Sequence, residues 1–252
     1  MSPAAAHRRE QAALIEVALP GARVAFSTRH GGVSEGPYES LNLGILTDDR
    51  PGRVARNRAI LAERAGLHPD GVAMGWQVHG SEIREWSARP GEVPFASRAS
   101  GPDDDLARVD GHVTSAEGLG LLVLVADCLP VALAGPDRVA MLHCGWRGLA
   151  AEIVERALVS FPQPPAAAIG PGIGACCYQV GDEVLAAFEG LDGVTEQRML
   201  DLREIARRKL RAGGVEHIED VGLCTSCRPD LFFSHRRDQG VTGRQAGLVW
   251  RA

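Results

Sequence analysis

Two histidines and one cysteine stand at comparable positions in three short segments of the sequence. His79 precedes a glycine, Cys128 shortly precedes a proline, and His143 shortly precedes a glycine. Each residue follows an apolar run that predicts a buried strand, at a point where the chain turns. Such junctions are where rigid scaffolds present functional groups. We therefore expect His79, Cys128 and His143 to form one site.

The types of these three residues indicate a metal site. Zinc binds imidazole nitrogen and thiolate sulfur in tetrahedral geometry, and three protein ligands with a fourth position open to water are typical of catalytic zinc sites. The ion lowers the pKa of its water toward about 7. Cu²⁺ also binds such ligands strongly, so copper in the same site is an alternative. Packing in the core is the ordinary role of a lone histidine or cysteine near a strand.

The elements that must position these residues are predicted from apolar periodicity. The expected strands cover residues 22–28, 72–78, 119–126, 131–134, 139–143, 166–169, 215–223 and 246–250. The expected helices cover residues 50–66, 149–161, 182–188 and 202–211. Strands 131–134 and 139–143 flank the turn 135–138, which indicates a hairpin and argues against a purely parallel sheet.

The whole pattern predicts one α/β (α+β) domain over residues 13–252, with a mixed sheet flanked by helices. Residues 1–12 read as a flexible arm because they contain little apolar pattern. Residues 87–108 hold three prolines and three consecutive aspartates, which predict a long exposed loop.

Composition excludes several classes of function. The chain has 252 residues, of which 45% are hydrophobic and 23% charged, values typical of a soluble globular protein. Its net charge of -5 argues against binding to nucleic acid. No apolar run approaches the roughly 18 residues of a membrane span, and the N-terminus lacks the features of a signal peptide. We expect a cytoplasmic protein, either a monomer or a homodimer, without disulfides.

Four other cysteines form two close pairs in the sequence. Cys224 and Cys227 have the spacing of a redox pair or of half a structural zinc site. A complete site would need two further ligands, and the adjacent Cys176 and Cys177 suit tetrahedral ligation poorly. We therefore expect Cys224 and Cys227 to be packed in the core.

Several longer strings resemble the signatures of one known family. The central ones are QVHG (77–80), ADCLP (126–130) and HCGWRG (143–148). Flanking strings are TRHGGVS (28–34), LNLG (41–44), GPGIG (170–174), CY (177–178), CTSC (224–227), FFSHRR (232–237) and TGRQ (242–245). In this order they resemble the laccase-domain or polyphenol oxidase family, also called YfiH-like, whose members are described as purine nucleoside phosphorylases. The resemblance runs from about residue 22 to the C-terminus.

This resemblance implies a single α/β domain and a zinc ion held by His79, Cys128 and His143. It also implies phosphorolysis of adenosine, inosine and methylthioadenosine to base and ribose 1-phosphate, with adenosine deamination as a further activity. Nucleosides and phosphate would then be the partners. The chain departs from the family pattern at Cys144 and His235, where alanine and tyrosine are usual. Because Cys144 adjoins a proposed ligand, it is an alternative thiolate.

Within this hypothesis, four further residues receive roles. Asp127 is the carboxylate nearest to the ligands in sequence and is a candidate proton carrier, or else a carboxylate that holds a ligand histidine. Arg147 lies just before the predicted helix 149–161 and is a candidate phosphate ligand, with the helix N–H groups beside it. Arg29 and Asn42 occupy Gly-rich loops and are candidate contacts for phosphate, ribose or base.

Three alternatives differ in chemistry. Cys128 could be a nucleophile with His143 or His79 as its base, in an amidohydrolase acting on cell-wall precursors. A copper-dependent polyphenol oxidase is the second alternative. Multicopper chemistry needs several histidine-rich sites, whereas the eight histidines here are scattered without a His-x-His pair. The third alternative is a non-catalytic regulatory module. The sequence disfavours it, because such a module has no evident need for an intact His/Cys/His trio.

Overall fold

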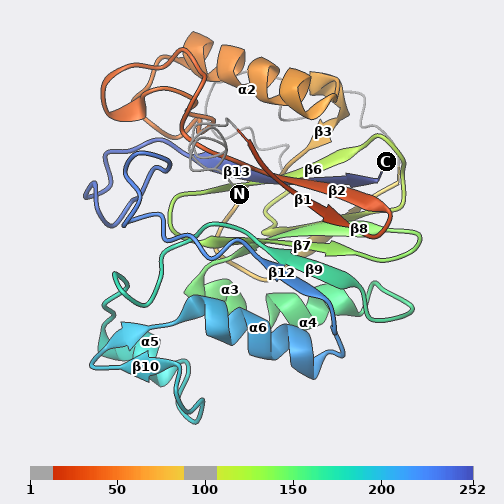
Figure 1. The fold of residues 1–252 in the computed structure, drawn as a ribbon, viewed down its shortest axis with the longest axis vertical. Coiled ribbons are helices and arrows are strands. Elements are labelled where there is room, and N and C mark those ends of the chain that lie inside the picture. The colour runs from red at the N-terminus through yellow and green to blue at the C-terminus, as the bar shows by residue number, and fades with distance from the viewer. Residues whose placement is uncertain (1–13, 88–106, 252) are drawn as a thin grey trace, which may run out of the picture.

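Two β-sheets packed face to face, with helices on both outer faces, form the computed structural model of the chain (Figure 1). The structure describes residues 14–87 and 107–251. The predicted arm 1–12 and nearly all of the predicted loop 87–108 lie outside the described residues. Within the described residues, no helix combines the length and the apolar character needed to cross a membrane.

The first sheet has five strands in the order β1-β2-β13-β6-β3. They are β1 (Leu14–Leu19), β2 (Ala22–Ser27), β13 (Gln245–Arg251), β6 (Gly120–Val125) and β3 (Val72–Ala73). The short β3 runs parallel to β6, and the other neighbours are antiparallel. The C-terminal strand therefore lies in the middle of the sheet, between an N-terminal strand and a central one.

The second sheet has six strands in the order β12-β9-β7-β8-β5-β4. They are β12 (Ile218–Asp220), β9 (Ala166–Ile169), β7 (Leu129–Ala134), β8 (Val139–Cys144), β5 (Gly111–Thr114) and β4 (Ile83–Trp86). Strands β7 and β8 form the predicted hairpin, whereas β12 runs parallel to β9 and β4 parallel to β5. The predicted α+β class with mixed pairing is confirmed, but the strands divide between two sheets.

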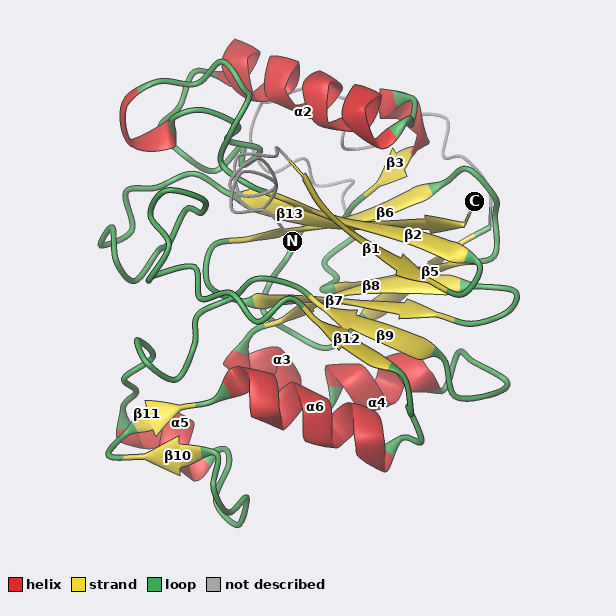
Figure 2. Cartoon of the chain, viewed as in Figure 1, coloured by secondary structure: helices red, strands yellow, loops and turns green. Residues whose placement is uncertain are grey.

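The helices cover the outer faces of this sandwich (Figure 2). Helix α2 (Pro51–Ala65) lies on the first sheet. Helices α3 (Trp146–Ala150), α4 (Ile153–Leu158) and α6 (Leu202–Ala212) lie on the second. The remaining elements are short: α5 (Asp182–Ala186), the hairpin β10 (Thr195–Glu196) and β11 (Met199–Leu200), and the 3₁₀ turns Gly36–Tyr38 and Pro69–Gly71.

Strand β6 shows why the central apolar runs of the sequence are continuous. Its residues Leu121 and Val123 pack between the two sheets, while Leu122 and Leu124 pack under α2. Because alternate side chains of a strand point to opposite faces, a strand covered on both faces needs apolar residues throughout. The chain thus builds three apolar layers, one between the sheets and one under each set of helices.

Two predicted elements differ from the structure near the candidate site. The strand predicted at 72–78 ends at Ala73. The helix predicted at 149–161 begins earlier, at Trp146, and divides into α3 and α4 at Glu152, whose φ is 65°. Arg147 therefore belongs to the first turn of α3 instead of preceding the helix.

Candidate metal centre and adjoining pocket

The three predicted ligands come together at one end of the sandwich. The ligand atoms of His79, Cys128 and His143 all lie within 4.8 Å of one another. His143 lies on β8, Cys128 directly precedes β7, and His79 lies in the loop that follows β3. The two imidazole rings meet edge to face, with centroids 4.8 Å apart. Segments from both sheets therefore contribute to one candidate centre.

A buried carboxylate, Asp110, connects the two histidine-bearing segments. Its Oδ1 lies 2.7 Å from Nδ1 of His143. It also accepts hydrogen bonds from three successive backbone N–H groups, those of Val78 (3.1 Å), His79 (2.9 Å) and Gly80 (2.7 Å). The φ of 60° at His79 is uncommon for a non-glycine residue, and such backbone can aim successive N–H groups at one anion. Asp110 thus sets the position of both histidines.

The same contacts set the charges of the centre. Burial raises the pKa of the Asp110 carboxyl, but the hydrogen bonds from His143 and the backbone outweigh it and hold that pKa below its ordinary value. Burial lowers the pKa of His143, whereas Cys128 and Asp110 raise it, to about 9. Burial raises the pKa of the Cys128 thiol, but His143 and His79 bring it down to about 6. The two histidines therefore favour the thiolate form of Cys128.

These residues fit a tetrahedral zinc or copper ion. With Nδ1 of His143 held by Asp110, its Nε2 is left for the metal, as is usual for ligand histidines. A Cβ at Gly145 would lie only 3.0 Å from Sγ of Cys128 and 3.4 Å from Cδ2 of His79. A side chain at position 145 would therefore press on two of the three ligands.

Cys144 does not join the centre. It follows His143 on β8, and its side chain packs in the apolar layer under α3 and α4, with no exposed surface. Burial raises the pKa of its thiol. Because adjacent strand residues point to opposite faces, the alternative in which Cys144 serves as the thiolate ligand does not agree with the structure.

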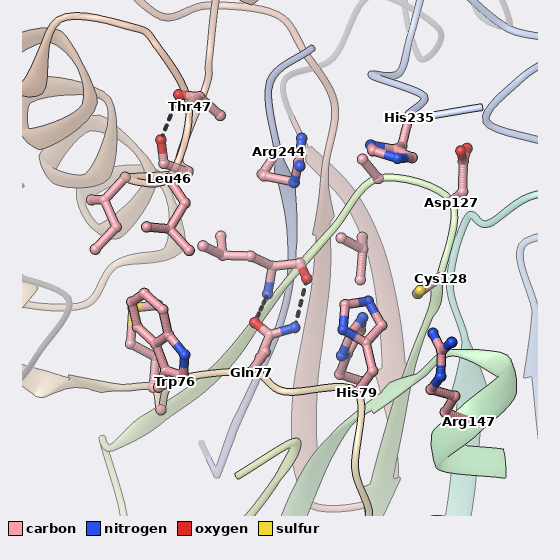
Figure 3. A pocket seen from close by; sticks show the side chains of 18 of the residues that line it. Leu46, Thr47, Trp76, Gln77, His79, Asp127, Cys128, Arg147, His235 and Arg244 are labelled. Carbon is pink, nitrogen blue, oxygen red and sulfur yellow. Dashed lines mark hydrogen bonds between the residues drawn. The ribbon is translucent and has the colours of Figure 1, made fainter. Parts of the chain in front are cut away.

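A pocket of about 420 Å³ opens over the centre (Figure 3). Trp76 and Leu46 line one end of it, and His79, Cys128 and Arg147 line the other. The pocket is mostly apolar with a few converging polar groups, which is typical of small-molecule sites of this size. Three arginines are among its lining residues: Arg147, Arg236 and Arg244.

The side chain of Gln77 fixes the loop that carries His79. Its Oε1 accepts the N–H of Leu124 at 2.8 Å, and its Nε2 donates to the carbonyl of Leu124 at 2.8 Å (Figure 3). Strand β3 pairs with β6 only at Val72 and Ala73. Further along β6, the amide of Gln77 takes the place of a strand backbone. This side-chain pairing explains why the predicted strand ends early. It leaves the backbone N–H groups of residues 78–80 available to donate to Asp110.

Asp127 lies in the wall of the pocket. Its Oδ1 accepts the hydroxyl of Thr225 at 2.6 Å, and its Oδ2 accepts the backbone N–H of Arg236 at 2.7 Å. The φ of Asp127 is 95°, so the chain turns sharply between this residue and Cys128. Asp110, and not Asp127, is the carboxylate that holds a ligand histidine.

The structure does not bring Arg29 and Asn42 into the pocket. The Arg29 guanidinium lies over the ring of Phe233 and donates to the carbonyls of Glu39 and Pro229. The Asn42 amide is fully buried, where its Oδ1 accepts the N–H groups of Gly44 and Arg244. Both side chains hold loops together, and neither lines the pocket as the sequence had predicted for a substrate contact.

Sequence reasoning missed several lining residues and the carboxylate beneath them. Tyr178, His235, Arg236 and Arg244 lie in strings that match the family pattern, so their positions could have been singled out. Asp110 lies outside those strings, beside the edge of the predicted long loop, and carried no comparable signal.

The match to known proteins covers nearly the whole chain. A family profile described as multi-copper polyphenol oxidoreductase laccase matches residues 23–252. The chain belongs to this family. Within it, the purine nucleoside phosphorylase YlmD of Geobacillus stearothermophilus is 35% identical over 92% of this chain and 90% of its own length. The purine nucleoside phosphorylase YfiH of Escherichia coli K12 is 36% identical over 91% of this chain and 94% of its own.

A solved member of the laccase-like family has the same fold. The crystal structure of the hypothetical protein YfiH of Bacillus licheniformis superimposes with a TM-score of 0.82 at 32% identity, covering 92% of this chain and 93% of that one. The family description and the names of the relatives point to different chemistry. Within the described residues, the only cluster that combines histidine with cysteine is the single His79/Cys128/His143 trio.

Proposed function

We propose that this laccase-domain protein is a zinc-dependent purine nucleoside phosphorylase that also deaminates adenosine. Its substrates would be adenosine, inosine and methylthioadenosine together with phosphate. The observation that carries the proposal is the pocket itself, which joins a His/Cys/His centre to three guanidinium groups and an apolar wall. The relatives named purine nucleoside phosphorylase support it.

The arginines supply what a phosphate co-substrate requires. Arg244 donates through Nη1 to the carbonyls of Thr242 and Gly243, and a guanidinium has more N–H donors than these bonds use. Arg147 stacks on Trp146, with its guanidinium 3.6 Å from the carboxylate of Glu183. Paired N–H donors on planar guanidinium groups bind phosphate oxygens in bidentate fashion. The charges on the phosphate would therefore be balanced beside the metal centre.

The opposite end of the pocket suits a purine. Trp76 presents a half-buried ring, and Leu46 is largely exposed at 63%. An aromatic face binds a flat base by stacking, and apolar neighbours exclude water from it. A nucleoside bound in this way would extend from Trp76 toward His79 and Arg244.

The chain also provides a group that can carry a proton. Among the described residues that line the pocket, Asp127 has the sole carboxylate. Loss of a purine base or of an amino group requires a proton at the departing nitrogen, and a positioned carboxyl can deliver it. A zinc ion held by His79, Cys128 and His143 would supply Lewis-acid polarisation and activation of water.

Product analysis on adenosine tests the proposal. Metal-replete protein should release adenine and ribose 1-phosphate when phosphate is present, and inosine when it is absent. Loading with zinc or with copper, each followed by the same assay, decides which ion supports the reaction. Protein that carries one metal ion in the His79/Cys128/His143 centre and forms neither product would contradict the proposal.

The role of Asp127 has a separate test. Asp127→Asn should lower kcat by roughly 10²- to 10⁴-fold, because an amide oxygen can still accept the hydrogen bond from Thr225 but an amide cannot take up and release a proton. The matched control is Asp137→Asn, an exposed change in the β7–β8 turn, which should leave kcat unaltered. Equal activity of the two variants in both reactions would remove Asp127 from the mechanism.

One observation favours a second candidate function. The pKa of the Cys128 thiol is lowered to about 6 beside His143, which also suits a nucleophilic cysteine of an amidohydrolase acting on cell-wall precursors. Chelation separates the two functions. A nucleophilic cysteine stays active in chelator and is lost on alkylation, whereas a zinc enzyme is inactivated when the metal is removed.

A further inference from the structure

Four cysteines gather outside the candidate centre. The ligand atoms of Cys176, Cys177, Cys224 and Cys227 all lie within 4.8 Å of one another. Sγ of Cys227 is 3.5 Å from Sγ of Cys176 and 3.4 Å from Sγ of Cys177. The expectation that Cys224 and Cys227 are packed in the core is wrong for Cys227, which is exposed, whereas Cys224 packs half-buried against the core.

Sheet topology brings the two pairs together. Strands β9 and β12 are parallel neighbours, so their C-terminal ends meet at one edge and the loops that follow run side by side (Figure 1). These loops are bonded to each other, since the N–H of Thr225 donates to the carbonyl of Gly172 at 3.1 Å and the N–H of Gly172 donates to Leu223 at 3.3 Å. The loops therefore hold the cysteines in a defined arrangement.

The adjacency of Cys176 and Cys177 is no obstacle in this setting. The two residues lie in a turn, where the N–H groups of Cys177 and Tyr178 both donate to the carbonyl of Gly174. Adjacent side chains diverge in a strand, but a tight turn can direct both toward one point.

The spacing of the sulfurs suits a metal better than packing or disulfides. A disulfide requires an S–S distance of about 2.05 Å, and all four cysteines are free thiols. Thiolates bound to one zinc ion at about 2.3 Å in tetrahedral geometry lie about 3.8 Å apart, close to the 3.4 and 3.5 Å seen here.

The backbone at Gly174 also suits a cluster of four cysteine sulfurs. The N–H of Gly174 points at Sγ of Cys224 at 3.2 Å, a contact that stabilises a thiolate. A Cβ at position 174 would lie 3.2 Å from Sγ of Cys176 and 3.6 Å from Sγ of Cys224. Glycine at this position therefore leaves room for the cluster.

We propose that Cys176, Cys177, Cys224 and Cys227 bind a structural zinc ion as a tetrathiolate site, separate from the His79/Cys128/His143 centre. Four protein thiolates with no open position are typical of structural zinc. On binding, the ion replaces the protons of the thiols, which pass to the solvent. The site joins the loop after β9 to the loop after β12.

This second site would hold one wall of the pocket. Tyr178 directly follows Cys177 and lines the pocket, while Thr225 directly follows Cys224 and donates to Asp127. The guanidinium of Arg236 lies over the ring of Tyr178, 5.1 Å from its centroid. Zinc here would thus position Asp127 and Tyr178. This consequence, unlike the site itself, rests on the proposed function.

Metal analysis of three variants tests the site. Protein loaded with zinc should contain two ions per chain, one for each ligand cluster. The double variant Cys224→Ser/Cys227→Ser should lose one ion, and His79→Ala should lose the other. Cys144→Ala removes a buried thiol outside both clusters and should keep both ions. Equal zinc content in the double variant and in Cys144→Ala would overturn the proposal, whatever the activity on adenosine.

Two measurements that keep all four cysteines serve if the double variant fails to fold. Cobalt substituted into His79→Ala should still give the strong near-ultraviolet charge-transfer bands of a tetrathiolate. The exposed Cys176 and Cys227 should resist alkylation until a chelator is added. Rapid alkylation of zinc-loaded protein, or mass spectra showing disulfides among these four cysteines in freshly purified protein, would contradict the site.

Discussion

Asp110 places both histidines of the candidate centre. It combines a hydrogen bond from His143 with three from the backbone around His79, and it has no exposed surface. Its negative charge also favours a positive ion among the ligands, because charges interact strongly where water is excluded. Asp110 thus fixes the orientation of the His143 ring and the backbone of His79, and its negative charge acts on both histidines.

Asp110→Asn should weaken zinc binding at this centre by roughly 10- to 100-fold, the usual effect of removing the partner of a ligand histidine. Competition with a coloured chelator measures the affinity. The exposed Asp137→Asn change serves as the control and should match the unaltered protein. Unchanged affinity in Asp110→Asn would show that the backbone alone holds the histidines.

His112 should make stability depend on pH. Burial lowers its pKa to about 4, with Asp110 opposing this and Arg84 adding to it. The ring accepts the N–H of Trp86 at Nδ1, at 3.2 Å. An unfolded histidine titrates near 6.5, so its stabilising contribution is complete above that pH and is lost as the pH falls toward 4, by about 3 kcal/mol in total.

Urea unfolding between pH 7 and pH 4.5 measures this effect. The variant His112→Gln has no such titration, so its free energy of unfolding should fall less over the same range, whatever its stability at pH 7. Other groups titrate equally in both proteins, so the difference between the two curves belongs to His112. Parallel curves would show that the ring is protonated in the folded protein.

Among the elements, the edge of the first sheet decides where the centre forms. Strand β3 is only two residues long, and the side chain of Gln77 continues its pairing with β6. The chain can therefore leave the sheet early and curve toward Asp110 while still bound to β6. An amide side chain is suited to this role because it carries the same donor and acceptor as a peptide group.

Gln77→Ala should lower the free energy of unfolding by about 1–3 kcal/mol, because the N–H and carbonyl of Leu124 lose their partner. Zinc binding should weaken as well, since the loop with His79 loses its attachment. Thermal unfolding and chelator competition measure the two effects. Gln179→Ala, an exposed glutamine outside the pocket, is the matched control. A loss of stability with unaltered zinc affinity would show that the attachment of this loop to β6 does not affect metal binding.

At the scale of the whole molecule, the two sheets approach closely at Gly247, where there is no side chain. A Cβ at Gly247 of β13 would lie 2.5 Å from Cβ of Pro130 and 3.2 Å from Sδ of Met141, both in the second sheet. The candidate centre depends on this contact, because Pro130 follows Cys128 by two residues and the hairpin of β7 and β8 carries His143.

Gly247→Ala should therefore destabilise the protein by about 1–3 kcal/mol through overpacking between the sheets. Gly52→Ala in α2 is the control, because its added Cβ meets nothing within 4 Å and glycine disfavours a helix. The two variants should shift the melting temperature in opposite directions. A Gly247→Ala protein with an unchanged melting temperature would indicate that the sheets can move apart without loss of stability.

Local pattern predicted many of the elements, but it missed β1, β4 and β5. The prediction for β9 agrees with the structure at both ends, and α2 and the β7–β8 hairpin agree within a few residues. These elements depend on neighbours close in sequence, such as apolar spacing, a helix-ending glycine and a turn. The α+β fold class was predicted from the order of these elements along the chain.

Tertiary structure alone decided which distant residues meet. Asp110 lies 33 positions from His143, and Cys176 lies 51 from Cys227. No local pattern links such pairs, because the strand order of the second sheet, and not spacing along the chain, brings them together. The three candidate ligands could be recognised by their types, but the carboxylate that holds the two histidines and the four sulfurs behind the pocket became visible only in the folded protein.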